Sequence, residues 1–136
     1  MLDKNAYDFG CWVIKYCHSN NYGITYRHDS MKNNDGIIVP LLWNHQHNNP
    51  AMVLGQALLK HRDDGIYTYF KLFDNDVGEK AKEIVLDQDT HVFISPFITS
   101  VKFDKNNVVS GSIREVSLTL ARIDPDDIYR PVLINV

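Results

Sequence analysis

Hydrophobic and polar residues alternate with a period of two along much of the chain, which is the spacing of a strand with one buried face. The alternation is clearest in residues 66–73 and 113–120. Aromatic and β-branched residues, which favour strands, are frequent in these and similar stretches. The pattern predicts strands at residues 9–16, 24–26, 52–60, 66–73, 91–103 and 108–120, with a break near Gly111, and a further strand that starts at Val39.

Helical periodicity is convincing at one place, after the polar residues 74–76, which supply a capping side chain. The apolar residues that follow share one helical face: Val77, Ala81, Ile84 and Val85. Upstream, the Asp64-Gly65 pair between two strand-like runs predicts a hairpin. Residues 18–36 are rich in Asn, Asp, Ser and Gly, and they predict a long irregular loop.

Many short strands and one helix, without a β-α-β rhythm, predict a mainly β protein of the α+β class with one or few helices. We expect an antiparallel β-barrel or a rolled sheet. The chain has no repeat, low-complexity tract or linker, and 136 residues are a common length for a domain with a single core. The prediction is one domain over residues 1–136.

Composition narrows the functional classes. The chain is 44% hydrophobic and 23% charged, with a formal net charge of -3, so no basic surplus is available to neutralise nucleic-acid phosphates. No apolar run is long enough to span a bilayer, and the first residues do not have the pattern of a secretory signal. Two cysteines do not form a disulfide framework, which favours a reducing compartment. We expect neither a nucleic acid nor a membrane as a partner.

Residues 39–47 begin as an apolar run and end in a polar cluster that contains two histidines, His45 and His47. This pattern predicts a strand that enters the core and whose last residues emerge at the rim. A histidine held there suits proton transfer. The plainer interpretation is a strand end with solvated imidazoles.

Two other stretches carry polar groups on strands. Ser95 falls on the same face as Phe93 and Phe97, and Pro96 after it requires an edge strand or a local distortion, because proline donates no ladder hydrogen bond. In residues 113–120, Glu115 shares a face with Ser117 and not with Val116. Glu115 is either solvent-facing surface or a carboxylate that orients a histidine.

Other chemistries are weaker. His45 and His47, two apart on a strand, share a face and could both bind a metal, but no further ligands cluster near them. A thiolate of Cys11 or Cys17 paired with His18 is conceivable as a nucleophile. Burial as small hydrophobic side chains is the simpler interpretation of both cysteines. We expect no metal and no cofactor.

Six stretches together resemble the capsid-maturation (prohead) protease family of tailed phages, which is related in fold to the herpesvirus assemblins. The resemblance covers roughly residues 9–127. It is carried by Phe-Gly-Cys-Trp at 9–12, Val-Pro-Leu-Leu-Trp-Asn-His-Gln-His at 39–47, Val-Leu-Gly-Gln-Ala-Leu-Leu at 53–59, Asp-Gly-Ile-Tyr at 64–67, Gly-Glu-Lys-Ala-Lys at 78–82 and Gly-Ser-Ile-Arg-Glu-Val-Ser-Leu at 111–118.

The resemblance implies a serine endopeptidase with an assemblin-like fold. The Leu-Trp-Asn-His motif of the family places the catalytic histidine on His45, the Leu-Ser-Ile motif places the nucleophile on Ser95, and the Glu-Val-Ser-Leu motif places the third member on Glu115. The chain departs from the family at Pro96, where Ile is usual, and in Asp-Pro-Asp-Asp at 124–127.

The resemblance also implies a setting. The substrates would be segments of the scaffold and of the major capsid protein. Self-cleavage would be a further reaction. The place would be the interior of the assembling prohead in the bacterial host cytoplasm, and self-association, for example as a dimer, is expected. The alternative is a non-catalytic capsid-assembly or scaffold-binding module of the same fold. If Ser95 were not the nucleophile, Ser117 and the cysteines would be next in line.

Overall fold

The computed structural model describes residues 7–20, 22–46, 48–87, 89–120 and 127–134. It is mainly β with a single α-helix among the described residues, as the sequence pattern predicts. The strands are β1 Phe9–Lys15, β2 Thr25–Tyr26, β3 Ile38–Trp43, β4 Val53–Arg62, β5 Gly65–Leu72, β6 Phe93–Asp104, β7 Asn107–Thr119 and β8 Val132–Leu133; the helix α1 is Asp76–Leu86, and the short 3-10 helices are η2 Lys32–Asn34, η3 Pro50–Met52 and η4 Asp127–Tyr129.

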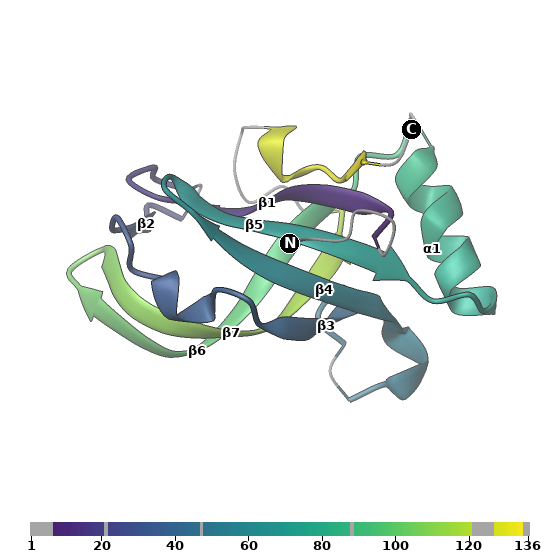
Figure 1. The fold of residues 1–136 in the computed structure, drawn as a ribbon, viewed down its shortest axis with the longest axis horizontal. Helices are drawn as coiled ribbons and strands as arrows, with labels where there is room; N and C mark the ends of the chain where they lie inside the picture. Colours follow the sequence, from purple (N-terminus) through teal and green to yellow (C-terminus); the bar gives the residue numbers. More distant parts are fainter. Residues whose placement is uncertain (1–6, 21, 47, 88, 121–126, 135–136) are drawn as a thin grey trace.

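One curled sheet contains all the strands, in the order β2-β7-β3-β4-β5-β1-β8, with β6 paired to β7 (Figure 1). The pair β4–β5 is the predicted hairpin: Arg62 pairs with Gly65 around a two-residue turn. The pair β6–β7 is a second, longer hairpin, which turns at Lys105 and Asn106.

Most of the described strand pairs are antiparallel, as expected, and two pairs are parallel. β3 runs parallel to β7, with Leu41 beside Val116 and Trp43 beside Leu118. β2 also pairs with β7 in parallel. Local alternation along one strand does not encode the direction of its neighbour, because both kinds of ladder present the same two faces.

The expected closed barrel is also wrong, and the rolled-sheet alternative describes the fold better: the sheet is open. Among the described residues, β6 pairs with β7 alone, so it forms one edge of the sheet. β1 packs close to β6 without backbone pairing in the described ladders. The register between β6 and β7 shifts three times, and such irregularities increase the local twist of a hairpin.

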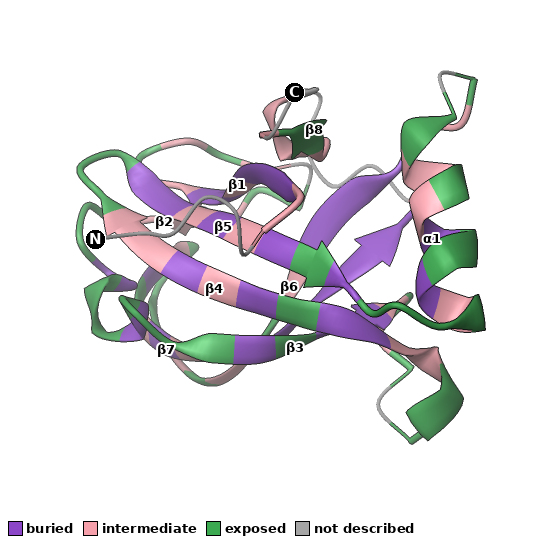
Figure 2. Ribbon diagram, turned by 45° about the vertical axis from the view of Figure 1, so that its right-hand side comes forward, coloured by how far each residue is buried: buried purple, intermediate pink, exposed green. Residues whose placement is uncertain are grey.

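Helix α1 covers the end of the sheet formed by β4 and β5 (Figure 2). Its first turn is capped by Asn75, whose Oδ1 accepts from the Gly78 amide at 2.8 Å. Val77, Ile84 and Val85 pack against the core, as the periodicity predicts. No helix among the described residues is long and apolar enough to cross a membrane.

The core lies inside the curl of the sheet, and buried residues alternate with less buried ones over residues 38–41 of β3 and 55–60 of β4, as the pleat requires (Figure 2). β7 does not follow this rule: its last residues, from Glu115 to Thr119, are all buried. A strand buried on both faces has polar side chains that are shielded from water, which is the feature that positions the candidate site.

Candidate functional site

The hairpin β6–β7 brings Ser95 and Glu115 to one face of the sheet. Ser95 lies directly opposite Ser117, and Phe97 lies opposite Glu115. Cross-strand partners point to the same side of a sheet, so Ser95 and Glu115 are diagonal neighbours. Arg114 has no partner in the register, so the strand contains a bulge at this residue. Because of the bulge, Ile113 lies in the core while Glu115 stays on the same face as Ser95.

His45 reaches the same face from the end of β3. The strand stops at Trp43, and Asn44 and His45 both adopt positive φ angles, 51° and 56°. Two consecutive left-handed residues turn the chain sharply, and Asn and His are among the residue types that tolerate this conformation best. The Asn44 amide donates to the carbonyl of Leu118 at 2.9 Å, and the His45 amide donates to Ser117 Oγ at 2.9 Å.

The imidazole of His45 bridges the two other candidates. Its Nε2 lies 3.1 Å from Ser95 Oγ, and its Nδ1 lies 3.1 Å from Glu115 Oε1. An ionised carboxylate can only accept hydrogen bonds, so Nδ1 carries a hydrogen and donates to Glu115. In the neutral ring, Nε2 is then the acceptor, and it faces the Ser95 hydroxyl. This is the arrangement in which a histidine can remove the serine proton.

The three side chains differ in their exposure to solvent. Ser95 and Glu115 are each 5% exposed, whereas the His45 side chain is 31% exposed, so the group opens to solvent on the histidine side. The plain interpretation of Glu115 as solvent-facing surface is therefore wrong, whereas His45 is partly exposed and has both ring nitrogens within hydrogen-bond distance of neighbouring side chains. A buried carboxylate is costly unless it is paired and hydrogen-bonded, and His45 supplies that pairing.

Pro96 does not displace Ser95. The residue lies in edge strand β6 opposite Val116, and the ladder is irregular from Phe97 to Ile98, immediately after it. The sequence required an edge strand or a local distortion at this proline, and the structure has an edge strand with an irregularity next to it. A proline whose missing N–H falls on the unpaired side of an edge strand costs no ladder bond.

A small pocket of about 50 Å³ lies between β1 and β6. Ile94 and Pro96, the residues on either side of Ser95, line it together with Val13 and Ile14 of β1. It therefore lies along the backbone segment that carries the serine.

The alternative metal site loses its main support. His45 lies in a turn beyond the end of β3, so the strand spacing that paired it with His47 does not apply, and both of its ring nitrogens already face Ser95 and Glu115. His47 itself lies outside the described residues. No three His, Cys, Asp or Glu side chains of the described part gather in a way that could hold a metal ion.

The cysteine alternative is also weakened. Cys11 is a core residue, 2% exposed, and desolvation raises the pKa of its thiol, which disfavours the nucleophilic thiolate. Cys17 is exposed. Neither cysteine belongs to the group that His45 assembles.

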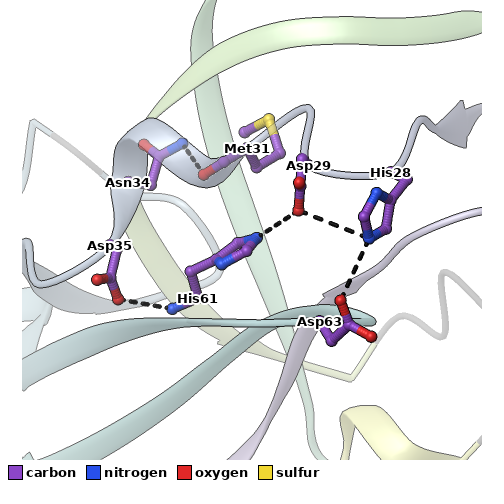
Figure 3. Close-up of polar contacts among 7 residues, drawn as sticks. All are labelled: His28, Asp29, Met31, Asn34, Asp35, His61 and Asp63. Carbon is purple, nitrogen blue, oxygen red and sulfur yellow. Dashed lines mark hydrogen bonds and ion pairs between the residues drawn. The ribbon is translucent and has the colours of Figure 1, made fainter.

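A second histidine–carboxylate cluster joins the loop before β3 to the β4–β5 hairpin (Figure 3). His61 Nε2 lies 3.0 Å from Asp29 Oδ1, and His28 Nε2 lies 3.4 Å from Asp63 Oδ1. The His61 amide also donates to Asp35 at 2.8 Å. The sequence left these residues scattered. These contacts connect the loop before β3 with the end of β4 and the turn after it, and surface contacts of this kind contribute little stability.

The sequence did not predict the hydrogen bond between the backbone amide of His45 and the side chain of Ser117. Ser117 appeared only as a reserve nucleophile, yet it accepts a hydrogen bond from the turn that holds the imidazole. The available signal was Asn44, a residue type that often marks left-handed turns, placed immediately before the histidine.

Comparisons with known proteins add no relative: no family model matches the chain, and no curated protein and no solved structure is similar to it.

Proposed function

We propose that this protein is a serine endopeptidase in which Ser95 is the nucleophile, His45 the general base and acid, and Glu115 the residue that orients the imidazole. One observation carries the proposal: the His45 ring lies 3.1 Å from Ser95 Oγ through one nitrogen and 3.1 Å from Glu115 Oε1 through the other. The three residues come from separate strands or strand ends, so local sequence does not force them together.

The chemistry follows from these positions. Ser95 Oγ attacks a peptide carbonyl while His45 Nε2 takes its proton, and Glu115 stabilises the imidazolium that forms. His45 then gives the proton to the leaving amine as the C–N bond breaks, which leaves an acyl group on Ser95. A water molecule, deprotonated by His45, hydrolyses this ester and restores the serine.

The biological setting rests on the resemblance to the prohead proteases of tailed phages. On this proposal the substrates are segments of the scaffold and the major capsid protein, and the enzyme itself is a further one. Cleavage takes place inside the assembling prohead in the bacterial host cytoplasm, with the protease self-associated. A high local concentration inside a shell favours cleavage of weakly bound substrates.

The alternative, a non-catalytic assembly module, drew its support from Pro96. That support is reduced because the edge position of β6 accommodates the proline while Ser95 Oγ stays within hydrogen-bond distance of His45. A buried Ser-His-Glu group at working distances also has no evident use in a module that only binds.

The first test needs no natural substrate. Purified protein is treated with a fluorophosphonate, which phosphonylates activated serines, and intact mass is followed with time. We expect one adduct, located on Ser95 by peptide mapping, and none in Ser95→Ala, while Ser112→Ala, a serine variant elsewhere on β7, reacts like the wild type. An unreactive wild-type protein, or equal reaction of Ser95→Ala, would count against the proposed nucleophile.

The second test addresses the substrates. The chain is co-expressed with a phage scaffold and a major capsid protein, in wild-type and Ser95→Ala forms, and the products are read by intact mass. Defined fragments that disappear in Ser95→Ala support a maturation protease. Intact partners in both samples, despite fluorophosphonate reactivity, would keep the serine hydrolase and remove these substrates.

A further inference from the structure

We infer that Ser117 is a positioning residue that sets the direction of the His45 imidazole through the His45 backbone amide. The inference rests on the proposed function, because it concerns how that site is held in working order. Ser117 Oγ accepts the hydrogen bond of the His45 amide at 2.9 Å, and Ser117 is completely buried.

The turn that carries His45 needs such a contact. Asn44 and His45 are both left-handed, a conformation that costs free energy for residues other than glycine and persists only where surrounding contacts hold it. Backbone pairing between β3 and β7 ends at Trp43 and Leu118, and the Asn44 amide makes the next bond, to the Leu118 carbonyl. Beyond this bond, the Ser117 hydroxyl, in place of a backbone carbonyl, accepts the hydrogen bond of the next amide, that of His45.

Two attachments to the same strand fix the ring. The amide of His45 is bonded to Ser117, and its Nδ1 is bonded to Glu115, two residues earlier on β7. These anchor points are separated by about 7 Å along the strand. With both present, Nε2 is aimed at Ser95; with the amide released, the ring can pivot about its remaining contact with Glu115.

The same contact argues against Ser117 as a substitute nucleophile. Its oxygen already accepts from the His45 amide, and its side chain has no exposure through which a peptide carbonyl could approach. Ser117 lies opposite Ser95 in the hairpin. The ring nitrogen that could accept a serine proton, His45 Nε2, is within hydrogen-bond distance of Ser95 Oγ.

The test compares Ser117→Ala with Ser112→Ala, a half-buried serine of the same strand that lies opposite Thr99. We expect Ser117→Ala to lower the fluorophosphonate labelling rate of Ser95 by on the order of 100-fold, the size of effect that a small misplacement of reacting groups can produce. Ser112→Ala should label at the wild-type rate. Thermal unfolding of both variants checks that the loss is not global.

A nitrogen-15 NMR spectrum supplies a readout that does not depend on activity. In Ser117→Ala we expect a shift of the His45 amide resonance and exchange broadening of its ring nitrogens, whereas Ser112→Ala leaves both unchanged. If the wild type labels at Ser95 and Ser117→Ala labels equally fast, the inference is overturned and the protease proposal stands. If nothing labels but the His45 ring signals change in Ser117→Ala, the positioning role stands and the protease proposal fails. Unchanged His45 signals in Ser117→Ala overturn the inference regardless of labelling.

Discussion

At the scale of single residues, Glu115 shows how environment changes the meaning of a side chain. It is a charged residue on a strand, 5% exposed, and its carboxylate lies 3.1 Å from the His45 ring. A carboxylate in that position holds one imidazole tautomer and stabilises the protonated ring. On the proposed mechanism, Glu115 would contribute through orientation and charge, and an isosteric amide removes the charge without opening a cavity.

Glu115→Gln tests this directly. We expect the Ser95 labelling rate, and kcat/KM once a substrate is known, to fall by roughly 10³- to 10⁴-fold, because the amide can stabilise the wrong imidazole tautomer and cannot compensate an imidazolium. Folding should persist, because Gln has nearly the shape of Glu and its amide can still form a hydrogen bond with the neutral His45 ring. Circular dichroism and thermal unfolding verify the fold, and a rate within threefold of wild type would exclude Glu115 from this role.

At the scale of elements, a buried asparagine joins the 3-10 helix η2 to strand β7. Asn34 is 1% exposed; its Nδ2 donates to the carbonyls of Met31 at 3.0 Å and Gly111 at 3.1 Å, and its Oδ1 accepts from the Ile113 amide at 2.8 Å (Figure 3 shows the Met31 bond). Through these bonds, the two backbone groups on either side of Ser112, the Gly111 carbonyl and the Ile113 amide, each have a hydrogen-bond partner. The strand break expected near Gly111 does not occur, and this side chain is one reason.

Asn34→Ala should therefore destabilise the fold by roughly 2 kcal/mol, because it leaves the buried Ile113 amide without its Asn34 acceptor and removes one donor each from the Met31 and Gly111 carbonyls. The measurement is the free energy of unfolding from urea titration. Asn33→Ala is the matched control: Asn33 is exposed and also donates to the Gly111 carbonyl, at 3.1 Å, so its loss should cost less than about 1 kcal/mol. Similar losses in both variants would contradict the assignment.

At the scale of the whole molecule, the curl of one open sheet creates the core. Cys11 of β1 lies inside it, and desolvation raises the pKa of the Cys11 thiol. Above the ordinary range of a thiol, the unfolded chain ionises while the folded chain does not, so this group makes the fold less stable as pH rises. At neutral pH, the rate at which the Cys11 thiol reacts with a reagent therefore measures how often the sheet opens.

We expect iodoacetamide at pH 8 to modify one cysteine of the native protein, Cys17, and to modify both after unfolding in guanidinium. The reason is that Cys17 is exposed and Cys11 is 2% exposed with a disfavoured thiolate. Intact mass gives the number of labels, and Cys17→Ser should remain unlabelled in the native state. Rapid native labelling of that variant would mean that β1 is not packed as described.

The sequence by itself determined the elements. Periods of two residues located the long strands, the Asp64-Gly65 pair located a hairpin, and the cap at Asn75 with its apolar face located the helix, since each depends on contacts within a few residues. The family resemblance carried by the motifs at 39–47 and 111–118, together with the serine that precedes Pro96, also suggested the three site residues.

Only the tertiary structure decided how these parts meet. The parallel pairing of β3 with β7, the open sheet and the burial of both faces of β7 depend on neighbours distant in the chain. So does the choice between a solvent-facing Glu115 and one that is buried and bonded to a histidine. His45 reaches it over a separation of 70 residues, through a left-handed turn held by Ser117. A side chain's local pattern fixes the face on which it lies, whereas its exposure and partner depend on what packs against that face.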